Sequence, residues 1–231
     1  MNAMVRAFVA IIVMLAGITQ TKAGELPKGF VYLGEVDAGI VQDMRYAGKQ
    51  NFTGAPVPGY EAGECVLAEP VARALKRVQA RFEADGKTLI VFDCYRPARA
   101  VRAFMDWTKK GKGEFDARYH PRVARGKLVA QGYIAARSGH SSGGSVDLTF
   151  GEKDASGHVV EAEMGGGFDL FDRRSHTESG EVDKEARANR RKLVETMKRE
   201  GFVNYAREWW HFRHADEPFA GRVHDFPVTS R

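Results

Sequence analysis

Apolar residues recur along the chain with two different spacings, which predicts a mixture of helices and short strands. Leu75, Val78 and Phe82 share one face of a helical pattern that begins near Pro70. The same spacing predicts helices over residues 98–109 and 184–200. Short apolar runs predict strands over residues 88–92 and 202–212, a pair of strands over 133–136 and 145–150, and strand-like pieces within 30–46.

These helices and strands follow one another without a regular alternation of strand, helix and strand. That order favours an α+β fold with a central antiparallel sheet and flanking helices. The 231 residues contain no internal repeat and no linker rich in Pro and Ser. We therefore expect a single domain that spans residues 24–231.

The first 23 residues differ from the rest of the chain. Arg6 is followed by an unbroken apolar run over residues 7–18, and Thr21-Lys22-Ala23 resembles a cleavage site. The run is short for a membrane span, which needs about 20 apolar residues. We interpret residues 1–23 as a secretory signal peptide, with an uncleaved N-terminal anchor as the alternative. The expected mature protein is exported, periplasmic and without stable membrane association.

The formal net charge of +5 becomes smaller once this leader is removed. Without Arg6 and Lys22 the 35 basic residues become 33, against 30 acidic residues. One basic stretch remains, but acidic residues are interleaved with it, which is typical of a solvated helix face. Its basic members are Arg187, Arg190, Arg191, Lys192, Lys198 and Arg199. We therefore expect no nucleic-acid partner.

Two cysteines, Cys65 and Cys94, are present in the chain. An even number of cysteines in an exported protein favours a disulfide, which would stabilise the fold by about 3 kcal/mol. The alternative is one or two buried free thiols. A nucleophilic role is disfavoured, because no histidine lies near either cysteine in the sequence.

Two segments far apart in the chain carry the residue types of a catalytic zinc site. The first, residues 138–147, surrounds His140 with Gly and Ser and ends at Asp147. Such a run lets the backbone bend closely, so the two side chains can converge on one point. The second segment contributes His211. Two imidazoles and one carboxylate bind Zn²⁺ and leave one position for water, so we predict one zinc ion per chain. The alternative for His140 is a glycine-rich surface turn.

Glu208 precedes His211 by three residues and is followed by Trp209 and Trp210. Tandem tryptophans are typical of a protein core, and we expect this of at least one of them. They also indicate that Glu208 lies in an apolar wall, where the pKa of a carboxyl group rises toward neutrality. A carboxylate of this kind beside a metal ion can take a proton from water and later return it.

Arg96 follows a strand-like run and is flanked by Asp93 and Pro97. A guanidinium fixed in a pocket can stabilise an oxyanion or bind a substrate carboxylate in a bidentate fork. The alternative is a structural ion pair between Arg96 and Asp93.

Seven segments together resemble the D-alanyl-D-alanine dipeptidases, including the vancomycin-resistance type, within the zinc D,D-peptidase superfamily. They fall in the order of that family and cover nearly all of the expected mature chain. The segments are Arg45-Tyr46-Ala47 with Asn51-Phe52, Gly59-Tyr60-Glu61, Asp93-Cys94-Tyr95-Arg96-Pro97, residues 138–147, Met164-Gly165 with Phe168-Asp169, Glu208-Trp209-Trp210-His211, and Asp225-Phe226-Pro227-Val228.

The resemblance implies a role for each residue of a complete active site. The implied zinc ligands are His140, Asp147 and His211, with Glu208 as catalytic base and Arg96 as the residue that stabilises the transition state. Substrate binding is implied for Ser138, Asp169 and Tyr46, which would line a dipeptide pocket, and for Asp93, which would orient Arg96. Asp169 would receive the free ammonium group of the substrate.

The leading hypothesis is therefore zinc-dependent hydrolysis of D-Ala-D-Ala to two D-alanines in peptidoglycan-related metabolism. The alternatives are a D,D-carboxypeptidase or L,D-endopeptidase that acts on cell-wall peptides, or a catalytically silent binding protein of the same fold. Two features depart from the family pattern. Ser145 stands where the superfamily prefers Ala, and the leader contrasts with resistance enzymes that act inside the cell.

Overall fold

The structure is a computed structural model that describes residues 25–231, so the predicted leader lies outside the described residues. The larger of its two sheets has six strands, with β2-β4-β5-β8-β7 in that order and β6 paired to β5. Every pair in it is antiparallel except β2 with β4. Its strands are β2 (Val41–Gln42), β4 (Lys87–Asp93), β5 (Ser145–Lys153), β6 (Val159–Glu161), β7 (Phe202–Asn204) and β8 (His211–His214). The predicted α+β class with an antiparallel sheet is confirmed.

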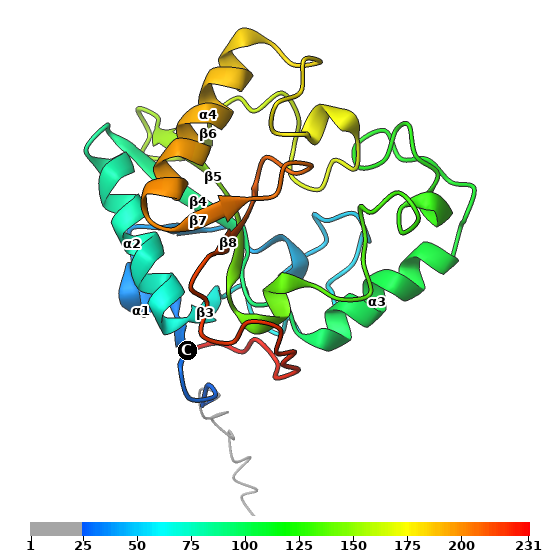
Figure 1. Ribbon diagram of the computed structural model, residues 1–231, viewed down its shortest axis with the longest axis horizontal. Coiled ribbons are helices and arrows are strands. Elements are labelled where there is room, and N and C mark those ends of the chain that lie inside the picture. The colour runs from blue at the N-terminus through cyan, green and yellow to red at the C-terminus, as the bar shows by residue number, and fades with distance from the viewer. Residues whose placement is uncertain (1–24) are drawn as a thin grey trace, which may run out of the picture.

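Three longer helices surround this sheet. Figure 1 shows α2 (Glu69–Glu83) beside α4 (Lys184–Arg199), with α3 (Ala98–Lys109) on the other side of the sheet. α2 packs against β4, whereas α4 packs against β7 and α2. The three helices match the predicted ranges to within one or two residues. Asp183 caps α4, because its side chain accepts the backbone N–H of Ala186 at 2.8 Å.

Shorter elements complete the chain. β1 (Phe30–Tyr32) and β3 (Val66–Ala68) form a separate two-stranded antiparallel sheet. One short helix, α1 (Leu33–Val36), follows β1. Four 3₁₀ turns lie in the loops: η1 (Arg45–Ala47), η2 (Arg125–Lys127), η3 (Gly139–Ser142) and η4 (Arg173–Ser175).

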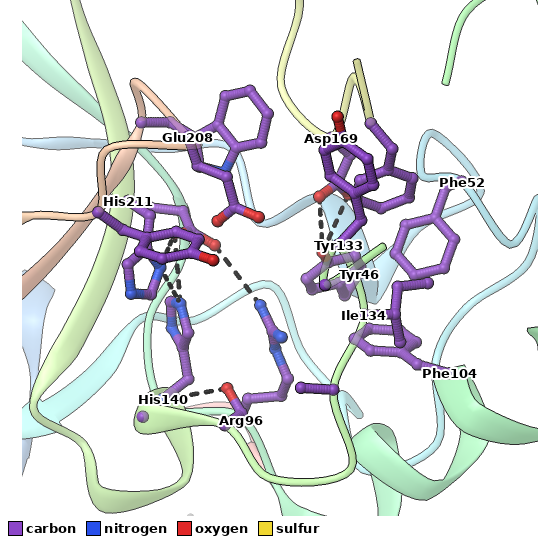
Figure 2. Close-up of a pocket in the computed structure, with 18 of the residues that line it drawn as sticks. Tyr46, Phe52, Arg96, Phe104, Tyr133, Ile134, His140, Asp169, Glu208 and His211 are labelled. Carbon is purple, nitrogen blue, oxygen red and sulfur yellow. Dashed lines mark hydrogen bonds and ion pairs between the residues drawn. The ribbon is translucent and has the colours of Figure 1, made fainter. Parts of the chain in front are cut away.

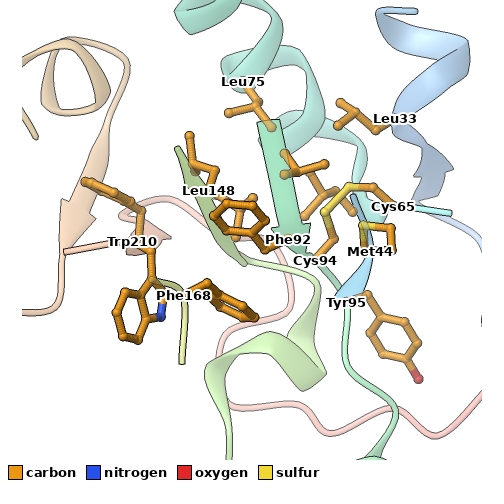
Figure 3. Packing of buried hydrophobic residues seen from close by; sticks show 14 of the residues in the cluster. Leu33, Met44, Cys65, Leu75, Phe92, Cys94, Tyr95, Leu148, Phe168 and Trp210 are labelled. Carbon is orange, nitrogen blue, oxygen red and sulfur yellow. A yellow bond between two sulfur atoms is a disulfide. The ribbon is translucent and has the colours of Figure 1, made fainter. Parts of the chain in front are cut away.

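The core is centred on β4 and β5. Every residue of β4 except Lys87 is buried, as expected for a strand covered on both faces. Figure 3 shows Phe92 of β4 and Leu148 of β5 packed among side chains from α2 and from the loops around Phe168. Cys65 and Cys94 form a disulfide next to this cluster. The predicted disulfide is therefore confirmed, and the alternative of free thiols is wrong.

Three expectations are wrong. Residues 133–136 form a loop, because no neighbouring strand pairs with them. Residues 202–212 do not form one strand, since a turn separates β7 from β8 and reverses the chain. Arg190 does not belong to a solvated helix face, because it is 1% exposed. Within residues 25–231, no helix has the length and apolar character needed to cross a membrane.

Candidate active site

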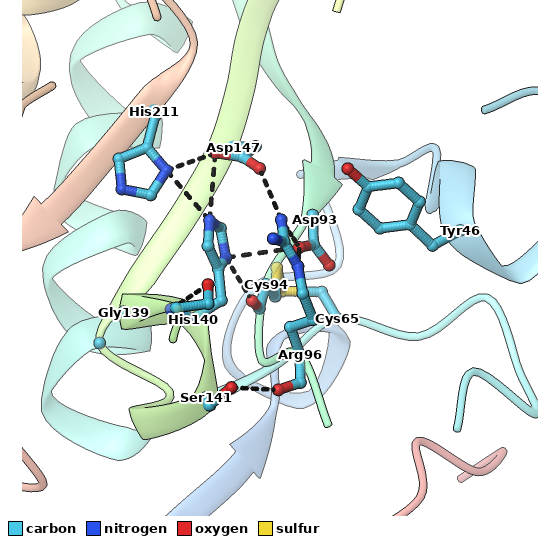
Figure 4. A network of polar contacts seen from close by, with 12 residues as sticks. Tyr46, Cys65, Asp93, Cys94, Arg96, Gly139, His140, Ser141, Asp147 and His211 are labelled. Atoms are coloured by element: carbon cyan, nitrogen blue, oxygen red, sulfur yellow. Dashed lines mark hydrogen bonds and ion pairs between the residues drawn. A yellow bond between two sulfur atoms is a disulfide. The ribbon is translucent and has the colours of Figure 1, made fainter. Parts of the chain in front are cut away.

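Three neighbouring strands bring polar side chains together at one end of the sheet. Asp93, the last residue of β4, lies opposite Asp147 of β5. Asp147 in turn lies opposite His211, the first residue of β8. Residues directly opposite one another in antiparallel strands place their side chains on the same face. The register therefore gathers two carboxylates and one imidazole at a single place, as Figure 4 shows.

His140 reaches the same place from the loop that precedes β5. It lies in η3, which Ser138 caps by accepting the His140 backbone N–H at its Oγ over 3.3 Å. The turn ends at Gly143, whose φ is +77°, and a Cβ at that position would collide with the ring of Phe30. Only glycine fits there. The His140 side chain is buried, so the alternative of a surface turn with an incidental histidine is wrong.

Two ring nitrogens and one carboxylate oxygen converge in this arrangement. His140 Nε2 lies 3.0 Å from His211 Nδ1 and 3.3 Å from Asp147 Oδ1, and His211 Nδ1 lies 2.9 Å from the same oxygen. The other ring nitrogen, His140 Nδ1, lies 2.7 Å from the carbonyl oxygen of Cys94. A carbonyl only accepts, so Nδ1 carries the proton and Nε2 presents its lone pair.

This donor set fits a divalent metal ion. Once His211 is deprotonated at Nδ1, three acceptor groups face one another, and a cation between them satisfies all three. His140, Asp147 and His211 are the group of candidate metal ligands within residues 25–231, and their ligand atoms all lie within 4.8 Å of one another. The contact from His140 Nδ1 to a backbone carbonyl is the kind of outer contact that fixes the ring of a metal-binding histidine.

Glu208 lies in the turn between β7 and β8, three residues before His211. Its backbone N–H donates to the carbonyl of Tyr205 at 2.9 Å, and its own carbonyl accepts the N–H of His211 at 3.2 Å. Figure 2 shows its carboxyl group pointing into the pocket beside His211 and Arg96. Burial in the pocket wall raises the pKa of Glu208 to about 7. A carboxyl group with such a pKa can both accept and return a proton near neutral pH.

Arg96 enters the pocket from the loop after β4. Its Nε donates to Asp93 Oδ2 at 2.9 Å, and its Nη2 lies 3.5 Å from Asp147 Oδ2. Asp93 is fully buried and also accepts the hydroxyl of Tyr60 at 2.6 Å. The Arg96 guanidinium lies 5.2 Å from the ring centres of Tyr46 and Phe104. The ion pair with Asp93 thus exists, and it holds a guanidinium that still lines the pocket.

Asp169 and Tyr46 form the opposite wall of the pocket. The Tyr46 hydroxyl lies 3.1 and 2.9 Å from the two carboxylate oxygens of Asp169. Burial, together with the negative charge of Asp147, raises the pKa of Asp169 well above its usual value. No arginine, lysine or histidine forms an ion pair with Asp169 among residues 25–231. A buried carboxyl group without a cation is stabilised by a positively charged ligand.

These groups line one cavity of about 330 Å³. Of the residues implied by sequence, eight lie in its wall: Tyr46, Arg96, Ser138, His140, Asp147, Asp169, Glu208 and His211. Asp93 lies beneath the wall, where its Oδ2 contacts Arg96 and lies 3.4 Å from His140 Nδ1.

Several lining residues were missed by sequence reasoning. The loop around Tyr133 and Ile134 covers one side of the cavity, where a strand was expected. Phe52, Phe171 and Tyr205 also line the cavity. Tyr60, which holds Asp93, lies in one of the motifs that carried the family resemblance. Its place in that motif is the sequence feature that could have identified Tyr60 as part of the site.

A single metal-binding set beside a carboxyl group with a pKa near neutrality places the protein in the class of metal-dependent hydrolases. Comparison with known families gives a narrower assignment. The model of the Peptidase_M15 family, described as D-Ala-D-Ala dipeptidase, matches residues 27–229. The chain belongs to this family of metallopeptidases.

Curated relatives carry the same description. A protein of Streptomyces coelicolor named D-alanyl-D-alanine dipeptidase is 42% identical over 87% of this chain and 98% of its own length. A protein of Enterococcus faecium with that name is 37% identical, also over 87% of this chain and 98% of its own length. One from Escherichia coli is 32% identical over 74% of this chain and 76% of its own.

Two solved structures are more distant. The vancomycin-resistance D,D-pentapeptidase VanY, a mutant in complex with Zn(II), is 20% identical with a TM-score of 0.39, over 65% of this chain and 73% of that chain. The D,D-dipeptidase VanXYg, in complex with a D-Ala-D-Ala phosphinate analog, is 19% identical with a TM-score of 0.37, over 82% of this chain and 68% of that chain.

Proposed function

We propose that this protein is an exported, zinc-dependent dipeptidase that hydrolyses D-Ala-D-Ala to two D-alanines. The observation that carries the proposal is the convergence of His140, Asp147 and His211 beside an ionisable Glu208 in one cavity. The choice of substrate is supported by the names of relatives that are 32–42% identical. Export and a periplasmic location are supported by the apolar run that precedes the described residues.

His140 Nε2, His211 Nδ1 and the Asp147 carboxylate would hold the zinc ion. When bound, zinc supplies a positive charge that polarises a carbonyl group and acidifies water. His140 is kept in the required tautomer by the Cys94 carbonyl. Each of these groups must be deprotonated to bind the ion, so zinc affinity falls at acidic pH.

Glu208 would act as the general base. Its carboxylate takes the proton from the attacking water and then gives it to the nitrogen of the leaving D-alanine, as the peptide C–N bond breaks. A pKa of about 7 suits both steps, because neither protonation state is strongly favoured at neutral pH. Arg96 would donate to the oxyanion that forms at the scissile carbonyl, and Asp93 keeps the guanidinium in place for this role.

Asp169 and Tyr46 would select the amino terminus of the substrate. A free ammonium group compensates the buried Asp169 carboxylate, whereas an acylated amine brings no charge. Ser138, at the start of η3, lies in the same wall and would contribute to the dipeptide pocket. This charge preference favours a dipeptidase over a carboxypeptidase or endopeptidase that acts on longer wall peptides.

An assay of the purified protein with a small panel of substrates tests the proposal. With one equivalent of zinc we expect hydrolysis of D-Ala-D-Ala, slower hydrolysis of L-Ala-L-Ala, and at least about a tenfold loss of kcat/KM for N-acetyl-D-Ala-D-Ala. Removal of the metal with a chelator should abolish turnover, and added zinc should restore it. A zinc-loaded protein that binds but does not cleave D-Ala-D-Ala would instead support a catalytically silent binding protein.

A further inference from the structure

Arg190 is a buried cation that forms no ion pair with a carboxylate among residues 25–231. It lies within α4 and is 1% exposed. Its guanidinium donates only to backbone carbonyls: Nε and Nη2 donate to Met164, the former at 2.8 Å, and Nη1 donates to His176 at 2.8 Å. Removing a charged group from water costs several kcal/mol unless it is well bonded. An apolar side chain in the same space would leave the carbonyls of Met164 and His176 without these donors, so the guanidinium is what holds the two carbonyls together.

The two carbonyls lie at the two ends of a single loop. The loop runs from Met164 to His176 and carries Asp169 into the cavity wall. Asp169 has a φ of +61°, and among residues 25–231 it is the one residue other than glycine with a positive φ. Such a conformation costs of order 1–3 kcal/mol and persists only where the surroundings hold it. Arg190 contacts both ends of this loop, because its single planar group donates to the carbonyls of Met164 and His176.

The end of the loop near His176 has further contacts with the turn between β7 and β8, which carries Glu208. The backbone N–H of Trp209 donates to Ser175 at 3.0 Å, and the N–H of Thr177 donates to Ala206 at 3.0 Å. At the other end, Asn189 donates to the carbonyl of Glu163 at 2.9 Å, but that bond is exposed. At the Met164 end, five residues before Asp169, the buried side-chain hydrogen bonds to the loop therefore come from Arg190.

We propose that Arg190 is a positioning residue for substrate recognition, which acts by holding Asp169 where it binds the substrate ammonium group. The proposal rests on the dipeptidase function proposed above. A guanidinium is suited to this task because its planar fork spans two carbonyls at fixed geometry. A lysine at this position keeps the positive charge but, with a single ammonium group, does not reproduce the fork.

A double-mutant cycle between Arg190 and Asp169 tests the proposal on the zinc-loaded, full-length mature protein. The variants are Arg190→Lys, Asp169→Asn and the two combined, with Arg191→Lys as a matched control because Arg191 is exposed on the same helix. We expect Arg190→Lys to raise KM for D-Ala-D-Ala about tenfold while kcat changes less than about threefold. The double variant should have the same KM as Asp169→Asn, and Arg191→Lys should match the unaltered protein.

Three results would overturn the proposal. Independent, multiplicative effects of the two substitutions would show that Arg190 does not act through Asp169. A fall in kcat at unchanged KM would show that Arg190 positions the turn that carries Glu208 and not Asp169. Failure of both Arg190→Lys and Arg190→Met to fold, measured by circular dichroism, would assign it to the stability of the whole domain. Failure of the dipeptidase function itself is separate, since the unaltered protein would then not cleave D-Ala-D-Ala.

Discussion

The two walls of the cavity are built in different ways. The wall with the candidate metal ligands consists of β4, β5 and β8, where Asp93, Asp147 and His211 lie in one register. The opposite wall, with Asp169 and Tyr46, consists of loops that no strand pairing orders. Strand pairing orders the three residues of the first wall, whereas hydrogen bonds within and between loops, such as that from the Trp209 N–H to Ser175, order the second. Reaction chemistry and substrate choice therefore depend on different kinds of structure.

The largest effect should come from Glu208, in the turn that leads into β8 of the first wall. We expect Glu208→Ala to lower kcat about 10²- to 10⁴-fold, the contribution of a positioned general base. The zinc content, measured by metal analysis, should not change, because Glu208 is not among the ligands. Glu208→Gln is the control for shape, and it should be as inactive as the alanine variant. Near-normal kcat in either variant would contradict the role of base.

The next effect concerns the disulfide, whose Cys94 directly follows β4. Replacing both Cys65 and Cys94 with alanine should lower the free energy of unfolding by about 3 kcal/mol, because the open chain gains entropy when it unfolds. Zinc affinity should also fall, since the Cys94 carbonyl holds His140 Nδ1. Urea denaturation and competition with a chelator measure the two effects. Unchanged zinc affinity in a destabilised variant would show that the ligand set is independent of the crosslink.

The loop wall should be sensitive to acid. Burial alone would raise the pKa of Asp172, but hydrogen bonds from Arg122 and from Arg174 lower it to about 2. Because the pKa in the folded state lies below the ordinary value, Asp172 stabilises the fold above about pH 4, and this contribution disappears as the pH falls toward 2. We expect Asp172→Asn to cost about 2 kcal/mol at pH 6. Urea denaturation at pH 6 and at pH 2 measures the free energy of unfolding. The difference between the variant and the unaltered protein should nearly vanish at pH 2.

The smallest effect concerns Ser145, the first residue of β5. Its side chain is fully buried, and its hydroxyl has no hydrogen-bond partner among residues 25–231. Ser145→Ala should therefore stabilise the protein by about 1 kcal/mol, because a buried polar group without a partner is removed. Thermal unfolding measures this, and kinetics should be unchanged. A loss of stability would mean that the hydroxyl is bonded in solution.

The candidate ligands could be predicted because their sequence signal is local. Glycines and serines around His140 predict a tight turn, and the short spacing between Glu208 and His211 predicts that the two lie close together. The turn between β7 and β8 was missed, since Phe202 and Phe212 at its two ends read as one apolar strand. Both are buried, but they lie in two antiparallel strands.

The loop wall could not be predicted in the same way. Asp169 was found only through the family resemblance, because no periodic pattern surrounds it. Arg190 was misread, since the sequence of α4 places it among other basic residues that do face water. Its burial depends on where α4 lies against the loop from Met164, and that is a tertiary contact. The loop over 133–136 has strand-like composition but no neighbouring strand.

The alternation of side chains along β8 restricts how this enzyme can diverge. If β8 slid by one position along β5, Phe212 would point toward the candidate metal site and His211 toward the apolar interior. Insertions in the loop over residues 133–136, which carries none of the candidate ligands, change the shape of the opening without moving a strand. New substrate preferences are thus accessible through loop variation, whereas any change that displaces a strand by a single position removes a ligand.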